Sequence, residues 1–270
     1  MNMIFISLFL NLIGSASAYI PPSYFILENI VKPRENAQPI QIEMVVKAFE
    51  NDQDAGIEFN EIIRYFPKEK IVLSQASESG KSEVFFQAFR KILSGASKTP
   101  VTDFLLFSPD PQVLAWILKS YRVPIVDPQM FDGKESLEAR RAKESLYLRK
   151  IEPAVLSWVI GSFAPPSAQL WVRKDAFRVD RFVFDASMVG GENTEIRFDD
   201  YRVLGGSVFP AKTALYISGT KVLEAQLIRW EPFSGGAPKA KDIKAEFTES
   251  GMDAGSSVKE LMRYYYRYIR

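Results

Sequence analysis

Residues 169–230 read QLWVRKDAFRVDRFVFDASMVGGENTEIRFDDYRVLGGSVFPAKTALYISGTKVLEAQLIRW, a stretch in which apolar and polar residues alternate in short segments. Alternation with a period of two is typical of strands that have one buried face. Glycine-containing pairs separate several of these segments, and glycine adopts the positive φ of tight turns at little cost. The stretch therefore predicts an antiparallel meander. Its five strands are Gln169–Arg173, Arg178–Asp185, Thr194–Tyr201, Val208–Ser218 and Lys221–Trp230.

Segments of the same kind lie upstream of this meander and predict a second one. In the second of them, Ile57, Phe59, Ile63 and Tyr65 face one way, and Glu61 interrupts that apolar face. The predicted strands are Ile40–Phe49, Ile57–Phe66, Ile71–Gln75 and Val84–Phe89. Further short strands are predicted at Leu146–Lys150, Ala154–Ile160 and Ala245–Phe247.

Helices are predicted outside these strands. Ser23–Val31 follows two prolines, carries an apolar side and is stopped by Pro33. Pro111–Tyr121 begins after Asp110, a good N-cap residue, within a helical excursion over about residues 108–146. Lys134–Glu144 in that excursion is charged and is expected at the surface. The predicted fold class is therefore α+β, mainly β.

The C-terminal segment, residues 251–270, is predicted to form a basic, tyrosine-rich helix. The favoured interpretation is a helix that packs on the sheet, and the alternative is docking on a membrane surface or a protein partner. One helical face collects Val258, Leu261, Met262, Tyr265 and Ile269. The basic residues are Lys259, Arg263, Arg267 and Arg270.

The N-terminus has the pattern of a signal peptide, predicted to cover residues 1–18. An apolar run, Met3–Ile13, is followed by small residues up to Ala18, which predicts cleavage before Tyr19. The run is too short to span a bilayer, which takes roughly 20 apolar residues. No cysteine follows the cleavage site, so a lipid-anchored mature form is not expected.

Composition excludes several kinds of chemistry. The 270-residue chain has no cysteine and no histidine, which removes thiolate and imidazole nucleophiles, bases and metal ligands. Its 34 Lys and Arg against 33 Asp and Glu give a net charge of +1, which does not favour nucleic-acid binding. We therefore expect a protein that is not an enzyme, with no metal site and no cofactor.

Several segments, taken in order, resemble the outer-membrane lipoprotein carrier (LolA-like) family of the Gram-negative periplasm. The clearest is QLWVRKD at Gln169–Asp175, and TEIRFDDYR at Thr194–Arg202 and GGSVFP at Gly205–Pro210 follow it. The other similar segments are Ile62–Lys70, Ser157–Gly161, Phe182–Phe184 and Ala245–Phe247. The resemblance assigns residues 19–250 to one domain.

The resemblance implies a strongly curved antiparallel sheet, an open half-barrel, with helices covering its concave face. It also implies an apolar cavity there that takes acyl chains, and no reacting groups are needed in such a site. The alternative is that the same side chains form a filled core. The candidate cavity residues are Ile42, Met44, Val46, Ile57, Phe59, Ile63, Phe182, Phe184, Ile196, Phe198, Leu215 and Ile217.

The resemblance also concerns an arginine that latches the lid in the family's carriers, directly before the proline of the second strand–turn. Phe66 stands at that position here, and Arg64, two residues earlier on the same strand face, is the latch candidate. The implied function is a periplasmic carrier of lipoprotein acyl chains or lipid in outer-membrane lipoprotein trafficking. Its partners would be membrane lipoprotein-sorting proteins, with at most peripheral membrane contact. The alternative is a periplasmic sensor or scaffold that binds a protein partner with the same fold.

Overall fold

The structure is a computed structural model and describes part of the chain. Three predicted segments lie outside the described residues: the signal peptide, the surface excursion Lys134–Glu144 apart from residue 139, and the strand Ala245–Phe247. The described residues are 21–50, 53–80, 84–91, 101–126, 139, 145–152, 155–162, 168–185, 193–238, 248–249 and 256–269.

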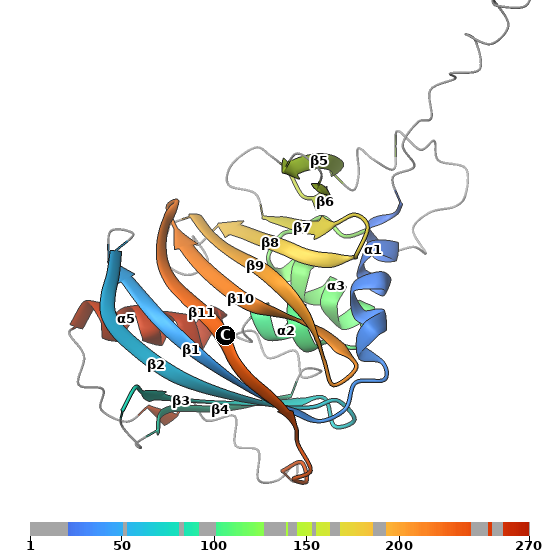
Figure 1. Cartoon of the computed structure of the whole chain (residues 1–270). Coiled ribbons are helices and arrows are strands. Elements are labelled where there is room, and N and C mark those ends of the chain that lie inside the picture. The colour runs from blue at the N-terminus through green and yellow to red at the C-terminus, as the bar shows by residue number, and fades with distance from the viewer. Residues whose placement is uncertain are drawn as a thin grey trace, which may run out of the picture.

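Twelve strands form one antiparallel sheet in the order β12-β4-β3-β2-β1-β11-β10-β9-β8-β7-β6-β5. Two meanders make it up, and the pairing of β1 with β11 joins them. Figure 1 shows the sheet as a strongly curved, open layer. The strands are β1 (Ile40–Glu50), β2 (Gln53–Phe66), β3 (Ile71–Glu78), β4 (Val84–Lys91), β5 (Leu146–Glu152), β6 (Val155–Ile160), β7 (Gln169–Arg173), β8 (Arg178–Asp185), β9 (Asn193–Leu204), β10 (Ser207–Ile217), β11 (Thr220–Pro232) and β12 (Thr248–Glu249).

The alternation in the sequence becomes the two faces of this sheet. In β9, Thr194, Ile196 and Phe198 are buried, whereas Glu195 and Arg197 on the other face form an ion pair. A glycine pair closes the turn from β9 to β10, with Gly205 at a φ of 56° and its carbonyl accepting from the Gln38 amide. The predicted half-barrel fold is thereby confirmed, and the register follows from one apolar face turned inward.

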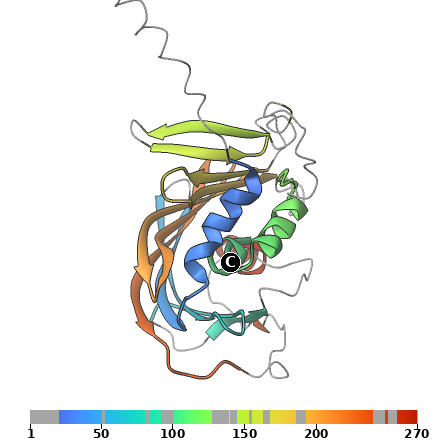
Figure 2. The ribbon, with the colours of Figure 1, turned by 90° about the vertical axis from the view of Figure 1, so that its right-hand side faces the viewer.

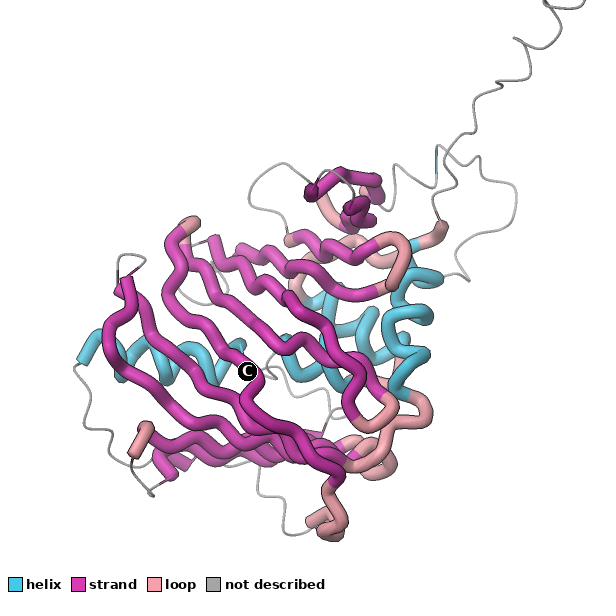
Figure 3. Tube along the Cα trace, in the orientation of Figure 1, coloured by secondary structure: helices cyan, strands magenta, loops and turns pink. Residues whose placement is uncertain are grey.

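Helices gather on the concave side of the sheet (Figures 2 and 3). α3 begins as predicted, because the Asp110 carboxylate accepts hydrogen bonds from the amides of Gln112 and Val113. α2 lies in a stretch for which no helix was predicted, and all seven of its residues are buried. No helix in the described part of the chain has the length and hydropathy needed to cross a membrane. The helices are α1 (Ser23–Val31), η1 (Lys32–Arg34), α2 (Val101–Phe107), α3 (Pro111–Ser120), α5 (Ser256–Tyr264) and the π-helical η5 (Tyr265–Ile269).

Candidate functional site

The floor of the candidate site is the concave face of the sheet. The structure brings ten of the twelve predicted cavity residues into one buried apolar cluster, while Ile57 packs half-buried against it and Ile217 is half-buried outside it. The ten are Ile42, Met44, Val46, Phe59, Ile63, Phe182, Phe184, Ile196, Phe198 and Leu215. Their shared face is as predicted, and their role in binding a ligand stays a prediction.

Glu61 belongs to the same inward face and is fully buried. It stands opposite Met44 in the ladder between β1 and β2, between the inward-facing Phe59 and Ile63. The sequence placed it on this face as an interruption of the apolar pattern. The floor therefore combines a large apolar surface with one buried carboxyl group.

An aromatic cluster connects α3 with the floor. Phe182 and Phe184 of β8 stack with ring centroids 5.3 Å apart, and Tyr121 at the end of α3 meets both edge-on at 5.5 and 5.3 Å. Burial raises the pKa of Tyr121 to about 12, with a smaller contribution from Tyr264 of the C-terminal segment. α3 thus rests on the sheet through rings in the edge-to-face geometry that aromatic pairs prefer.

Arg34, at the end of η1, makes polar contacts with the C-terminal end of α2. Its guanidinium donates to the carbonyl oxygens of Ser108 at 2.8 Å, of Phe104 at 3.5 Å and of Leu105. The last four carbonyls of a helix have no partner within the helix, and the end of the helix dipole there favours a positive charge. Arg34 therefore caps α2 from a different segment of the chain.

Burial makes Arg34 an unusual cap. Its side chain is only 5% exposed, and this burial lowers the pKa of Arg34 to about 10. Within the described residues its hydrogen bonds go to main-chain oxygens. Burial of a charge costs solvation free energy, and the carbonyls at the end of α2 offset part of this cost only while α2 stays in place.

Tyr65 of β2 gives α2 a second polar contact. Its hydroxyl donates to the Phe107 carbonyl at 2.9 Å, and its ring lies 4.8 Å from the Phe107 ring. Sequence reasoning placed Tyr65 on the inward face but identified neither its partner nor that of Arg34. The only signal for Arg34 is its position directly after Pro33, where the first helix ends.

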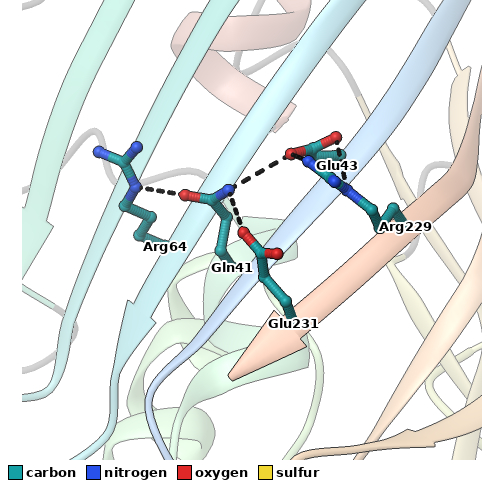
Figure 4. A network of polar contacts seen from close by, with 5 residues as sticks. All are labelled: Gln41, Glu43, Arg64, Arg229 and Glu231. Carbon is teal, nitrogen blue, oxygen red and sulfur yellow. Dashed lines mark hydrogen bonds and ion pairs between the residues drawn. The ribbon is translucent and has the colours of Figure 1, made fainter. Parts of the chain in front are cut away.

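The predicted latch, Arg64, makes its contacts on the opposite, convex face of the sheet (Figure 4). Its Nε donates to Gln41 Oε1 at 2.7 Å, and Gln41 Nε2 donates to Glu231 at 3.1 Å and to Glu43 at 3.3 Å. Arg229 completes the network through a 2.6 Å ion pair with Glu43. Arg64 therefore ties β2 to β1 and β11 on the outer surface.

Phe66, which stands at the family's latch position, lies on that outer face as well. Its ring meets Phe233 edge-on at 5.6 Å, and the Arg64 guanidinium lies 5.1 Å from the centre of the same Phe233 ring. Arg34 and Tyr65 are side chains that make polar contacts with α2. The role of Arg64 as a lid latch stays a prediction, and its contacts in the structure lie on the outer face.

Tyr65 gives the protein a testable dependence on alkaline pH. Burial raises the pKa of Tyr65 to about 12, above the value of about 10 of an exposed tyrosine. Above about pH 10 the unfolded chain therefore loses this proton before the folded chain does, and the free energy of unfolding falls between about pH 10 and 12. We expect this fall to be smaller by about 2 kcal/mol in Tyr65→Phe, measured by urea unfolding at about pH 9 and pH 12.

The control for this measurement is Tyr147→Phe, because Tyr147 is exposed on β5. It should keep the full alkaline loss of stability. The loss of the hydrogen bond to Phe107 lowers the stability of Tyr65→Phe at both pH values, so only the difference between them tests the prediction. An alkaline loss that is equal in Tyr65→Phe and in the wild type would contradict it.

The C-terminal segment, α5 with η5, lies on the concave side of the sheet (Figure 2). Met262, Tyr265, Tyr266 and Ile269 are buried, which agrees with the favoured interpretation of a helix packed on the sheet. The described residues hold no group of three or more acidic side chains that could bind a metal ion. The candidate site on the concave face therefore consists of packed apolar side chains together with the polar contacts that Arg34 and Tyr65 make with α2.

No protein-family model matches the chain, and no curated protein matches it. Among solved structures, the chain is similar to a LolA superfamily protein from Nitrosomonas europaea, with a TM-score of 0.46, 10% identity and coverage of 83% of this chain and 99% of that one. It is also similar to an outer membrane lipoprotein-sorting protein domain from Vibrio parahaemolyticus, with a TM-score of 0.46, 12% identity and coverage of 80% and 94%. A third similar structure is that of a DUF1329 family protein from Desulfovibrio piger, with a TM-score of 0.45, 11% identity and coverage of 83% of this chain and 100% of that one.

Proposed function

We propose that this chain is an exported periplasmic carrier that binds an acyl chain, of a lipoprotein or a free lipid, between its concave face and the helices that cover it. The observation that carries the proposal is the way in which α2 is held. A mostly apolar helix lies on a mostly apolar floor, and Arg34 and Tyr65 fix it through hydrogen bonds to carbonyls at its C-terminal end. Such a cover can separate from the floor without breaking any strand pairing.

The energetics suit an acyl chain as the ligand. Each CH₂ group that leaves water contributes about 0.8 kcal/mol, and the contribution is non-directional. An acyl chain can therefore replace the apolar contacts that α2 and α3 make with the floor, while Arg34 and Tyr65 favour the closed state when the site is empty. Delivery would require sorting proteins at the inner or outer membrane, which exchange the ligand with this carrier.

A second function, a periplasmic sensor or scaffold that binds a protein partner, is favoured by one observation. β11 exposes two large apolar side chains, Ile228 at 64% and Trp230 at 39%. A contiguous exposed apolar surface often marks a site that another protein covers, and these two side chains are two positions apart on β11. In this case the concave face would be a filled core, and the partner would bind the outer surface.

The two functions are separated by native mass spectrometry of the mature protein, purified gently from its own periplasm, followed by lipid extraction. The carrier should show added mass from an acylated compound. After delipidation it should bind dansyl-undecanoic acid, a fluorescent fatty acid that oleate displaces. An apo mass without probe binding, together with a stable protein partner in the pull-down, would overturn the carrier and leave the scaffold.

A further inference from the structure

The C-terminal segment, defined as Ser256–Ile269, lies on the concave side of the half-barrel and contacts one strand of each meander. The Tyr266 ring stacks on Phe86 of β4 with centroids 4.4 Å apart, and the Tyr264 hydroxyl lies 3.3 Å from Thr194 Oγ1 of β9. β4 and β9 are separated in the sheet by β3, β2, β1, β11 and β10. Because the sheet is curved, two residues of the segment that are only two positions apart can contact both of these strands on its concave side.

The inner side of the segment belongs to the same apolar cluster as the predicted cavity residues. Met262, Tyr265, Tyr266 and Ile269 are members of the cluster that contains Ile42, Phe59, Phe182 and the other floor residues. Its outer side carries Glu260 and Arg263, which are exposed. The segment is thus an amphipathic helix that occupies an apolar site with one face and meets solvent with the other.

The segment pairs with no strand of the described sheet. It follows β12, and no strand ladder includes any of its residues. Its last five residues form a π-helix, a less stable backbone arrangement that is frequent at functional sites. Displacing the segment would cost apolar contacts and a few polar ones, and an acyl chain in the same place would restore apolar contacts of the same kind.

We propose that the C-terminal segment is a built-in occupant of the ligand site, which an acyl chain must displace in order to bind. This inference rests on the proposed carrier function and adds a regulation of the same site. Because only the fraction of molecules with a displaced segment can bind, the apparent affinity for the acyl chain is lowered by that fraction. A change that expels the segment should therefore tighten binding.

The test uses two adjacent substitutions in the full mature chain, Met262→Asp and Arg263→Asp. Both place an aspartate in α5, but Met262 is fully buried on the floor whereas Arg263 is exposed. The buried aspartate should expel the segment, because burying an unpaired carboxylate is strongly unfavourable. We expect Met262→Asp to bind dansyl-undecanoic acid about tenfold more tightly than the wild type, and Arg263→Asp to stay within about twofold.

Hydrogen exchange of the wild-type protein provides a second readout that needs no variant. Saturation with dansyl-undecanoic acid should speed amide exchange in residues 256–269 if the fatty acid displaces the segment. This readout decides the question if Met262→Asp fails to fold.

The outcomes separate the two proposals. Tighter binding by Met262→Asp and faster exchange in the liganded wild type would support the built-in occupant. Equal binding by the wild type and Met262→Asp, or unchanged exchange in residues 256–269 of a liganded wild type, would overturn it and leave the carrier function standing. If no form binds the fatty acid, the carrier function is wrong, and this inference falls with it.

Discussion

Arg34→Ala is expected to lower the free energy of unfolding by about 3 kcal/mol and to release α2 from the sheet. The alanine leaves the carbonyls of Leu105 and Ser108 buried without their donor, and each unpaired buried carbonyl costs about 1–3 kcal/mol. Removal of the buried charge returns part of this cost, since burial already lowers the pKa of Arg34. Urea unfolding measures the total, and hydrogen exchange of residues 101–107 measures the release of α2.

Two companion variants assign the effect to the guanidinium. Arg34→Lys keeps a positive charge but has no planar fork to reach several carbonyls at once, so it should recover less than half of the lost stability. Lys32→Ala removes an exposed charge from the same short helix and should change stability by less than about 0.5 kcal/mol. If Arg34→Ala were as stable as Lys32→Ala, the hydrogen bonds of Arg34 to α2 would make no net contribution to the stability of the protein.

The expected effect on binding connects this prediction with the carrier function. If α2 is the cover of the site, its release should speed the association of dansyl-undecanoic acid, because entry no longer waits for the cover to open. The dissociation rate should rise as well, since the cover also holds the ligand in. Association and dissociation rates that match those of the wild type would mean that the fatty acid does not enter past α2.

The strands were predictable because each has one inward and one outward face. The period of two marks every strand of the last meander, and the glycine pairs mark most of its turns. α3 was also predictable from local sequence, since an N-cap aspartate followed by proline, Asp110 and Pro111, marks the start of a helix without knowledge of the fold. The strands and α3 could thus be predicted from residues that are close in sequence and from the alternation of buried and exposed positions.

α2 could not be predicted in this way. All its residues are buried, and a helix that is buried on every side has no polar face and hence no period of 3.6. The role of Arg34 was hidden for a related reason, because its partners are main-chain carbonyls about 70 residues away and no sequence pattern marks them. Contacts of this kind follow only from the three-dimensional fold.

The position of Arg64 illustrates a constraint that the sequence already contained. With Ile63 and Tyr65 on the inward face of β2, residue 64 must point outward, since a strand has only two faces. The family resemblance favoured Arg64 as a latch, whereas the alternation of its neighbours indicated the outer surface where Gln41 and Phe233 meet it. The local pattern decided the position of the side chain.

Phe182→Ala tests whether the concave face is a packed core around its aromatic cluster. Phe182 is fully buried and contacts both Phe184 and Tyr121, so its truncation removes contacts between the sheet and α3. In a tightly packed interior, Phe→Ala costs about 3–5 kcal/mol through lost apolar transfer and the cavity left behind. We expect a loss in this range in urea unfolding.

The matched control is Phe25→Ala on α1, whose side chain is 44% exposed and meets Phe177 edge-on at 6.0 Å. It removes the same atoms at a site that is largely solvated, and its cost should stay below about 1 kcal/mol. If Phe182→Ala lowered the free energy of unfolding by less than about 1 kcal/mol as well, the prediction would be contradicted, and the side chains around Phe182 would be loosely packed. Loose packing is what an acyl-binding site requires. Tighter binding of dansyl-undecanoic acid by Phe182→Ala would in that case place the acyl chain beside β8.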